Sequence, residues 1–443
     1  MPSGGSRLPV LAHPRSSSAR LSGPVPQGSG RPRYAVVTLG CKLNQADSAG
    51  AAGRLREVFD EAAGPHEADL LLLNTCTVTH KADAEARRLI RKLRRENPKA
   101  LLCVTGCGAR RDAASFAEMP EVDHLLAEHD EAARFLSEMA GEGAARAPLP
   151  PPFFFGRTRA MLKIQEGCNL RCSYCIVPKV RGRSRSVEPA DAEAGLRRLL
   201  GAGFKEIVLT GINTGAYGAD LKGRRVRLPS LLERLLSLDG DFRLRLNSLE
   251  PRTITPDIAS LISSSRGRLC RHLQVPMQSG SDAVLAAMRR NYRASAYASV
   301  VENLAATIPG IGIGADVLVG FPTETADDFK MTLGLIERLP IAFIHAFSFS
   351  PRPGTLAASM ALLSPREVAA RMGEIMALAA QKKRAFIESQ RGQRLRALAL
   401  SKEILTDNFI KAALSGAPAP RNTFLDVMIK VDGATGVIAV PAP

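Results

Sequence analysis

Three closely spaced cysteines are the residues of this chain best suited to do chemistry. Cys168, Cys172 and Cys175 stand in the run Glu-Gly-Cys-Asn-Leu-Arg-Cys-Ser-Tyr-Cys, a CxxxCxxC pattern. Iron–sulfur cubanes usually take four cysteine ligands, so a cube held by three keeps one iron free for a molecule that is not protein. Structural zinc, the first alternative, favours CxxC pairs that close a tetrahedral shell, and no second pair follows nearby. A purely structural group of thiols is the other alternative, and the spacing favours the cluster.

A second cysteine trio is dispersed along the first quarter of the chain. Cys41, Cys76 and Cys107 each follow a short apolar run that predicts a strand, at residues 34–39, 69–73 and 100–105. The loops after parallel strands meet at one edge of a sheet. We therefore expect these thiols to converge on a second cluster rather than to be buried structural cysteines. Cys103 lies inside the third strand and is predicted to be a core thiol.

The elements around the second trio predict its domain. Helical patterns at 45–63 and 81–96 separate the strands, and residues 122–127 predict a fourth strand. Alternating strands and helices predict an α/β domain with a doubly wound parallel sheet over residues 34–145.

Residues 157–385 predict a partial (β/α)6 barrel. Its six strands are expected near 161–166, 205–210, 242–248, 271–277, 312–319 and 343–349. Its helices are expected near 189–202, 228–238, 255–263, 281–308 (broken) and 325–338. Barrels of parallel strands carry their chemistry on loops at the strand C-termini, and the cysteine triplet follows the first strand.

The remaining segments differ in composition. Residues 1–33 are rich in Ser, Gly, Pro and Arg and predict a disordered extension, and the proline-rich residues 146–156 predict a linker. A long helix is expected at 365–391. Residues 386–443 predict a small β-barrel with strands at 395–400, 409–413, 425–431 and 435–440. This unit is either a nucleic-acid-binding module or an appendage that only holds the catalytic domain.

Charge and hydropathy indicate the partners. The chain has 443 residues and a net charge of +17, which favours a polyanion, nucleic acid first, although a solubilising surface charge is the alternative. Lys179, Arg181, Arg183 and Arg185 follow the triplet, where they are expected to contact RNA phosphates, although a solvated surface face is the alternative. No apolar run approaches the ~20 residues that cross a membrane, so no membrane partner is expected. The eight cysteines do not form a dense disulfide framework, and we expect a reducing, cytoplasmic location.

The triplet, with Tyr174 before its last cysteine, resembles the cluster loop of radical S-adenosylmethionine (SAM) enzymes. The resemblance implies that Cys168, Cys172 and Cys175 form the catalytic cluster site and that the open iron chelates the methionine part of SAM. An electron from the cluster then cleaves SAM to a 5′-deoxyadenosyl radical. Tyr174 is implied to lie against the bound SAM.

The order of domains resembles the methylthiotransferases, over roughly residues 34–430. In that family a three-cysteine cluster domain precedes a radical SAM barrel and a C-terminal TRAM domain. Several segments resemble the branch that acts on threonylcarbamoyladenosine in transfer RNA (tRNA). They are Thr-Leu-Gly-Cys-Lys-Leu-Asn (38–44), Asn-Thr-Cys-Thr-Val-Thr (74–79), Lys-Ile-Gln-Glu-Gly-Cys-Asn (163–169), Leu-Thr-Gly-Ile-Asn-Thr-Gly (209–215) and Pro-Met-Gln-Ser-Gly-Ser (276–281). The isopentenyladenosine branch typically has Gly-Cys-Gln-Met-Asn at the first cysteine and the ribosomal-protein branch has Gly-Cys-Pro-Lys, whereas Lys42 follows the cysteine here.

The resemblance implies two [4Fe-4S] clusters, two uses of SAM and an electron donor such as flavodoxin or ferredoxin. A methyl group goes to sulfur at the cluster of Cys41, Cys76 and Cys107, and the radical removes hydrogen from C2 of the modified adenine at position 37 of tRNA. Two alternatives have another target, isopentenyladenosine tRNA or a ribosomal-protein aspartate. A third is a noncatalytic iron–sulfur RNA-binding protein.

The resemblance also suggests SAM contacts, each with an alternative as a turn or cap residue. They are Gly211, Asn213, Glu250, Gln278, Ser279 and Gly320, all after predicted barrel strands. Thr406-Asp407-Asn408-Phe409 resembles a TRAM strand, but the sequence after it is short and rich in Ala, Pro and Gly, so the TRAM-like domain is expected to be degenerate.

Overall fold

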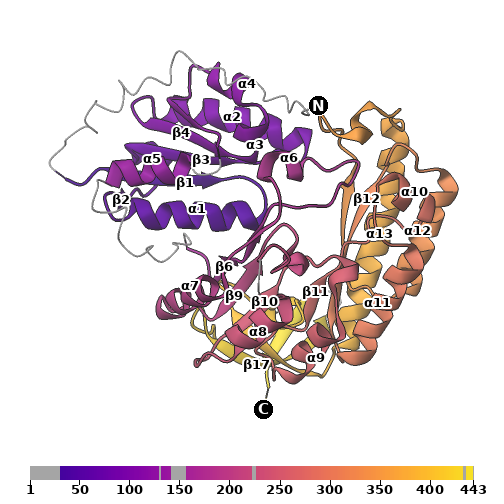
Figure 1. Cartoon of the computed structure of the whole chain (residues 1–443). Helices are drawn as coiled ribbons and strands as arrows, with labels where there is room; N and C mark the ends of the chain where they lie inside the picture. Colours follow the sequence, from indigo (N-terminus) through magenta and orange to yellow (C-terminus); the bar gives the residue numbers. More distant parts are fainter. Residues whose placement is uncertain (1–29, 129–130, 141–155, 222–225, 433–435, 443) are drawn as a thin grey trace.

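The computed structural model describes residues 30–128, 131–140, 156–221, 226–432 and 436–442. An N-terminal α/β unit, a curved strand–helix barrel and a small β-barrel follow one another along the chain (Figure 1). Most of the predicted extension 1–33 and linker 146–156 lies outside the described residues. The predicted domain boundaries stay predictions.

The N-terminal sheet is parallel throughout, in the order β2-β1-β3-β4-β5. Its strands are β1 (Arg33–Thr38), β2 (Asp60–Glu61), β3 (Leu70–Thr75), β4 (Leu101–Gly106) and β5 (His124–Leu126). Every residue of the central strand β3 is buried, which explains its run of four leucines. The predicted doubly wound sheet is confirmed, and β2 is an addition whose two exposed acidic residues carry no strand pattern.

Helices cover both faces of this sheet (Figure 1). Helices α1 (Lys42–Leu55) and α5 (Glu131–Ala140) pack on one face, and α2 (His80–Glu96), α3 (Cys107–Arg111) and α4 (Ala113–Ala117) on the other. The prediction of a helix to residue 63 is wrong. The chain leaves α1 at Arg56 because Asp60 and Ala62 donate their backbone N–H groups to Pro32 and Tyr34, which adds β2 to the sheet.

Six parallel strands form the central barrel. They are β6 (Arg159–Lys163), β9 (Glu206–Thr210), β10 (Arg243–Leu246), β11 (His272–Gln274), β12 (Gly312–Val319) and β13 (Phe343–Ser348). Two parallel bridges, Leu244 to Leu269 and Ser248 to Gln274, join the two halves. The predicted partial (β/α)6 barrel is confirmed. A short antiparallel pair, β7 (Gln165–Glu166) and β8 (Arg185–Ser186), brackets the triplet loop.

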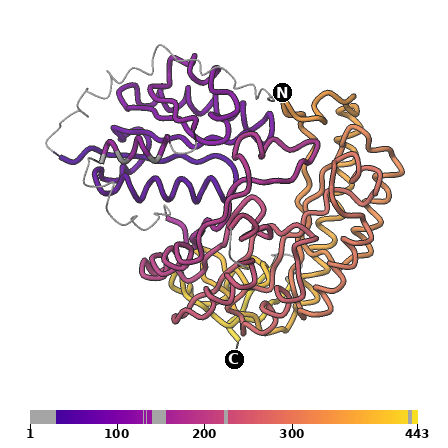
Figure 2. The backbone as a smooth tube through the Cα atoms, viewed as in Figure 1, coloured from indigo at the N-terminus to yellow at the C-terminus, as the bar shows by residue number. Residues whose placement is uncertain are grey.

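An outer layer of helices follows the barrel, as the continuous trace in Figure 2 shows. It comprises α7 (Pro189–Gly201), α8 (Leu228–Leu236), α9 (Pro256–Ser264), α10 (Asp282–Ala287), α11 (Ala294–Thr307), α12 (Ala326–Arg338) and α13 (Pro365–Ser389). Helix α13 belongs to two cores, because Ile375 and Leu378 pack in the central barrel and Ile387 packs in the C-terminal one. No described helix is long and apolar enough to span a bilayer.

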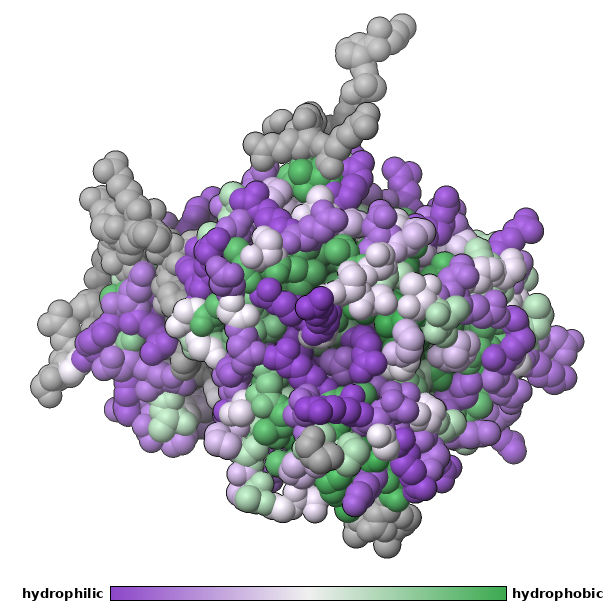
Figure 3. All heavy atoms as spheres, turned by 90° about the horizontal axis from the view of Figure 1, so that it is seen from below, coloured by the Kyte–Doolittle hydropathy of each residue, from purple (hydrophilic) through white to green (hydrophobic). Residues whose placement is uncertain are grey.

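The C-terminal unit is a closed barrel in the order β14-β15-β16-β18-β17. Its strands are β14 (Arg394–Ala399), β15 (Glu403–Thr406), β16 (Lys411–Leu414), β17 (Phe424–Asp432) and β18 (Gly436–Pro441). The sequence pattern misses β15, and the predicted strand at 409–413 begins only at Lys411 because Phe409 occupies a turn with φ +76°. Figure 3 shows hydrophilic side chains interspersed with small hydrophobic patches on the underside of the molecule.

The turn after β15 closes the N-terminal end of the central barrel. Arg245 donates to the carbonyl oxygens of Asp407 (2.9 Å) and Thr406 (3.0 Å), and the Phe409 ring stacks on His272 with centroids 4.2 Å apart. A Cβ atom at Gly312 would lie 2.2 Å from the Asn408 carbonyl oxygen. This segment of the TRAM-like domain therefore anchors one barrel to the other.

Candidate active site at two cysteine trios

The triplet loop begins where only glycine fits. Gly167 has φ +69°, and a Cβ atom there would lie 2.1 Å from the Arg183 carbonyl oxygen. The Cys168 N–H donates to the Gly182 carbonyl oxygen at 3.1 Å, which fixes the first cysteine against the far side of the loop. The loop runs from β7 to the short helix α6 (Val177–Arg181).

Ser173, between the second and third cysteines, ties the loop to the barrel. Its hydroxyl donates to the Ala287 carbonyl oxygen (2.8 Å), its N–H donates to Met288 (3.0 Å), and its own carbonyl accepts from Ala357 (2.8 Å). These contacts come from the end of α10 and from the loop after β13. The three thiols are therefore held on a rigid loop at the C-terminal edge of the barrel strands.

Burial disfavours the ionised form of two of the three thiols in the triplet. Burial raises the pKa of Cys175 to about 12, and burial also raises the pKa of Cys168. Two N–H groups nevertheless point at sulfur, from Leu170 to Cys168 (3.4 Å) and from Arg290 Nη1 to Cys172 (3.3 Å). N–H donors to cysteine sulfur are a usual means of tuning iron–sulfur clusters, so this donor set fits one.

The second trio meets at the C-terminal edge of the N-terminal sheet. Cys41 is the N-cap of α1, Cys76 follows β3, and Cys107 begins α3 directly after β4. Burial raises the pKa of Cys76, the Val78 N–H lowers it, and the neighbouring Cys107 and Cys41 raise it further. Residues 35 and 31 positions apart in sequence are thus brought within electrostatic range of one another. Cys103 lies apart in β4 with no exposed surface, as a core thiol should.

Backbone and amide groups fix the loops beside Cys76 and Cys107. Gly106 has φ +99°, and a Cβ atom there would lie 2.3 Å from Asn74 Oδ1. Asn44 Nδ2 donates to the carbonyl oxygens of Leu39 (2.8 Å) and Thr75 (3.0 Å), so it fixes the loops that carry Cys41 and Cys76.

Arg181 connects the two trios. It ends α6, six residues after Cys175, and its Nε donates to Cys107 Sγ at 3.1 Å. Its Nη1 also binds Asp47 (2.9 Å) and Glu166 (2.8 Å), and only 1% of the side chain is exposed. The expectation that Arg181 contacts RNA phosphate is therefore wrong, whereas its neighbours Lys179, Arg183 and Arg185 are exposed.

Apolar contacts join the same two loops. Cys107 packs with Ile176, the residue after Cys175, and with Val180 on α6. Arg352, 2% exposed, adds a further link from the loop after β13 to Thr77, one residue after Cys76, at 3.1 Å. The loops that carry the two trios are therefore packed against each other.

The predicted SAM-contact positions after β9 surround Gln165, which sequence reasoning missed. A Cβ atom at Gly211 would lie 2.8 Å from Gln165 Oε1, and the Asn213 N–H donates to the same oxygen at 2.9 Å. Asn213 Oδ1 is buried and has no protein hydrogen-bond partner. An unpaired buried acceptor is what a ligand amino group would satisfy. Gln165 lies inside the segment 163–169, one of the segments that resemble the family, and this resemblance could have identified Gln165 as a site residue.

Glu250 lies beside the triplet through Arg290, which forms an ion pair with it and also contacts Cys172. Arg290 Nε is buried and has no hydrogen-bond partner. No sequence pattern around Arg290 predicts its contacts with Glu250 and Cys172. Tyr174 packs its ring edge-on to Phe321 at a centroid distance of 6.5 Å. These residues form one wall beside Cys172.

The other predicted SAM-contact positions form hydrogen bonds within the fold. Gln278 has φ +63°, and its carbonyl accepts from Leu318 at 2.9 Å. The Ser279 hydroxyl lies 3.2 Å from Thr332 Oγ1 and accepts from the Ser281 N–H, so the fold already uses it. Gly320 has φ +75° and donates its N–H to Glu324 at 2.9 Å. Their contacts with SAM stay predictions.

Lys42, next to Cys41, points away from the sheet and toward the barrel. Its Nζ donates to Asn247 Oδ1, just after β10, at 3.0 Å. Burial lowers the pKa of Lys42 to about 8, and the nearby cations Arg159 and Arg245 contribute to the shift.

Neither trio is arranged around a single ion. Within the described residues, no group of three or more His, Cys, Asp or Glu side chains is placed to hold one metal ion. Each cysteine of a cubane binds a different iron, so a cluster needs a wider spacing than one ion does.

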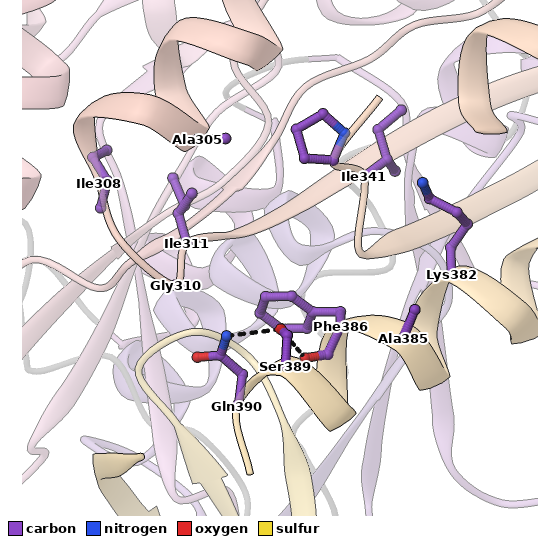
Figure 4. Close-up of a pocket in the computed structure, with 11 residues that line it drawn as sticks. Ala305, Ile308, Gly310, Ile311, Ile341, Lys382, Ala385, Phe386, Ser389 and Gln390 are labelled. Atoms are coloured by element: carbon purple, nitrogen blue, oxygen red, sulfur yellow. Dashed lines mark hydrogen bonds between the residues drawn. The ribbon is translucent and has the colours of Figure 1, made fainter. Parts of the chain in front are cut away.

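A separate pocket of about 300 Å³ lies between α11, the start of β12 and α13 (Figure 4). Lys382 on its edge already donates to the carbonyl oxygens of Glu337 (3.0 Å) and Leu339 (2.6 Å). The pocket is at the N-terminal end of β12, opposite the cysteines, and plays no part in their site.

Comparisons with known proteins identify relatives of this chain. Residues 33–127 match an uncharacterized protein family, UPF0004, and residues 162–336 match the radical SAM superfamily. The threonylcarbamoyladenosine tRNA methylthiotransferase MtaB of Bacillus subtilis is 37% identical over 74% of this chain and 75% of its own length. The protein of the same name from Aquifex aeolicus is 33% identical over 87% and 97%. The tRNA-2-methylthio-N(6)-dimethylallyladenosine synthase of Carboxydothermus hydrogenoformans is 35% identical over 76% and 81%.

The fold also resembles solved structures. The radical SAM methyltransferase TsrM from Kitasatospora setae, with tryptophan and a SAM analogue bound, superposes with a TM-score of 0.53. The match covers 72% of this chain and 73% of TsrM at 16% sequence identity. At that identity the likeness concerns the fold alone.

Proposed function

The chain belongs to the methylthiotransferase family of radical SAM enzymes, and from this premise we propose that it methylthiolates threonylcarbamoyladenosine in tRNA. The reaction is placed at C2 of the modified adenosine at position 37. The superfamily uses a [4Fe-4S] cluster and SAM, and we assign these to Cys168, Cys172 and Cys175.

We assign a second [4Fe-4S] cluster to Cys41, Cys76 and Cys107. When bound, the two clusters supply the electron that cleaves SAM and the sulfur that becomes the methylthio group. The observation that carries the proposal is Arg181, which follows the triplet and donates to Cys107 Sγ at 3.1 Å. This contact supports one reaction space for both trios, as a transfer of sulfur to a radical-activated carbon requires.

The residues of the chain bind and orient the reactants in this proposal. Asn213 Oδ1 accepts from the amino group of SAM, since it is buried and free of a protein partner. Tyr174 packs beside SAM, and we assign further SAM contacts to the backbone at Gly211, Gln278 and Gly320, which follow barrel strands. Glu250 orients Arg290 next to Cys172, and Ser279 supports the strand end.

The target is assigned from the relatives and from Lys42. Relatives named for threonylcarbamoyladenosine and for dimethylallyladenosine have similar identities, 37% and 35%, so identity alone does not separate the two substrates. Lys42 favours the first, because a partly buried ammonium group is a poor neighbour for an apolar dimethylallyl chain. We place the tRNA phosphates on the exposed Lys179, Arg183 and Arg185 near the triplet, and the reaction in the cytoplasm with flavodoxin or ferredoxin as the electron donor.

The test is a reaction with the anaerobically reconstituted protein, SAM and dithionite. Two unmethylthiolated tRNAs serve as substrates, one with threonylcarbamoyladenosine and one with dimethylallyladenosine at position 37, and the digested nucleosides are weighed by mass spectrometry. The threonylcarbamoyl nucleoside is expected to gain a methylthio group, and the variant Cys168→Ala to form none. Product on the dimethylallyl nucleoside alone would move the chain to the other branch.

A further inference from the structure

Lys42 is a cation without an ion-paired carboxylate at the boundary between the N-terminal unit and the central barrel. Among the described residues it donates to the Asn247 amide oxygen and forms no ion pair with a carboxylate. Its backbone is fixed next to Cys41, the N-cap of α1, whereas its ammonium group reaches the barrel side of the interface. A lysine that is partly removed from water without a counterion loses hydration that a protein anion does not replace.

The acidic groups near Lys42 are already committed to other partners. Glu206 binds Arg243 and Arg245 at the base of the barrel. Asp316 accepts from Gln274 Nε2 at 2.8 Å and lies 3.5 Å from His345 Nδ1. Each of these carboxylates therefore has a nearer partner than Lys42, and neither forms an ion pair with it.

Asn247 links the ammonium group to the segment after β10 that leads to Glu250. Asn247 lies three residues before Glu250, which pairs with Arg290, and Arg290 donates to Cys172 Sγ at 3.3 Å. Lys42 thus extends from one trio, at Cys41, toward the loop that borders the other. A nucleobase that reacts with groups held by both trios must occupy this space.

On the basis of the proposed function, we infer that the Lys42 ammonium group binds the free carboxylate of the threonylcarbamoyl substituent and so determines specificity for it. In threonylcarbamoyladenosine the threonine is attached through its nitrogen, which leaves its α-carboxylate ionised. The dimethylallyl group of the other substrate class is apolar and would leave the ammonium group unpaired. A site built around a charged group rejects an analogue that lacks the partner more strongly than an apolar pocket does.

The test compares two anticodon stem–loop RNAs of identical sequence. One carries threonylcarbamoyladenosine, and the other carries the same nucleoside with its carboxylate converted to the methyl ester. Because the phosphates are the same in both, the ratio of their dissociation constants isolates the carboxylate contact. The full chain, reconstituted with iron and sulfide, is expected to bind the acid about tenfold more tightly than the ester, as a charge-assisted hydrogen bond provides.

Lys42→Met is expected to bring that ratio close to one, and Lys42→Arg to retain part of the preference. Lys179→Met is the matched control. Loss of this exposed lysine near the triplet should weaken the binding of both RNAs equally and leave the ratio of their dissociation constants unchanged. Iron content and SAM cleavage without RNA, both measured on Lys42→Met, establish that the variant is folded and loaded. A folded, iron-loaded Lys42→Met that keeps the wild-type preference overturns the inference.

Failure of the inference about Lys42 can be distinguished from failure of the proposed function. If the wild-type protein methylthiolates threonylcarbamoyladenosine but Lys42→Met keeps the acid preference, the inference fails and the proposed function stands. If the wild-type protein methylthiolates only dimethylallyladenosine, the proposed function fails and the inference fails with it.

Discussion

Cys103 and Cys107 lie four residues apart, but their surroundings give them different chemistry. Cys103 is a fully buried residue of β4, and burial raises the pKa of its thiol far above the ordinary value. Cys107 begins α3 at the sheet edge and receives the Arg181 Nε–H at 3.1 Å. Burial raises the pKa of Cys107 as well, but the Arg181 guanidinium opposes that rise, whereas no cation among the described residues acts in this way on Cys103.

This contrast predicts the iron content of two variants. Cys107→Ala, reconstituted anaerobically, is expected to lose about half of the iron of the wild-type protein, since one of two cubanes loses a ligand. Cys103→Ala is expected to keep all of it. Iron and sulfide quantitation checks both, and equal iron loss in the two variants would contradict the assignment of the second cluster.

Arg181 allows a prediction about stability. Arg181→Met removes one of the two cations that bind Asp47 and Glu166, Lys163 being the other, which should lower the free energy of unfolding by about 1–3 kcal/mol. The control Arg183→Met changes an exposed side chain and should cost less than about 0.5 kcal/mol. Urea unfolding of the cluster-free proteins measures the difference, and similar costs would show that the buried network contributes little.

The site residues differ in how far the sequence can predict them. The triplet is contiguous, so its spacing is visible directly, and Cys41, Cys76 and Cys107 follow from strands whose ends must meet at one sheet edge. Arg181 and Arg290 could not be assigned, because their contacts depend on how distant loops pack. Arg290 touches Cys172, 118 positions earlier in the chain.

At the scale of elements, local pattern identifies long, regular segments and fails where a tertiary contact overrides it. Helix α2 and strand β12 lie where apolar periodicity places them. Helix α1 ends before the predicted residue because the chain after it pairs with β1. The sequence pattern does not predict β15, because this strand has only four residues and precedes a turn with a positive φ at Phe409.

Two glycine substitutions are predicted to have opposite effects on stability, one at the junction of β4 and α3 and one on α13. Gly106→Ala introduces a Cβ atom 2.3 Å from Asn74 Oδ1 at φ +99° and should cost at least about 1–3 kcal/mol and reduce iron binding by the second trio. Gly373→Ala, in open space on α13, should stabilise the protein by about 0.5–1 kcal/mol. Thermal unfolding and iron content are the measurements. Normal iron content in Gly106→Ala would mean that the tight turn is not needed to place Cys107.

At the scale of the whole molecule, the three units are joined by buried charge as well as by apolar packing. Glu206, Arg243 and Arg245 lie at the base of the central barrel with at most 1% exposure. The two arginines also donate to carbonyl oxygens of the C-terminal barrel, from Leu405 (2.8 Å) to Asp407 (2.9 Å). The order of the units could be predicted from composition and periodicity, but this junction could not, since it unites strands about 160 positions apart.

The junction predicts an acid-dependent loss of stability. Burial alone would raise the pKa of Glu206, but Arg245 and Arg243 lower it well below its ordinary value. A carboxylate whose pKa is lower in the folded protein stabilises the fold at pH values above its unfolded-state pKa. This contribution to stability declines as pH falls through the range between about 5 and 2. Urea unfolding of the cluster-free protein should therefore show Glu206→Gln about 3–5 kcal/mol less stable than wild type at pH 7, with the gap narrowing below pH 5. A gap independent of pH would contradict an ionised Glu206.

The central claim, that both trios serve the methylthiolation of threonylcarbamoyladenosine, is tested most directly in the organism that makes this protein. Mass spectrometry of tRNA nucleosides compares a strain that lacks the gene with the same strain complemented by wild type, Cys107→Ala or Cys168→Ala. The account predicts that the methylthio form of threonylcarbamoyladenosine disappears in the deletion strain, returns with wild type and with neither variant, and that the dimethylallyl nucleosides are unchanged. Persistence of the methylthio form without this protein, in a strain with no second enzyme of the family, would contradict it.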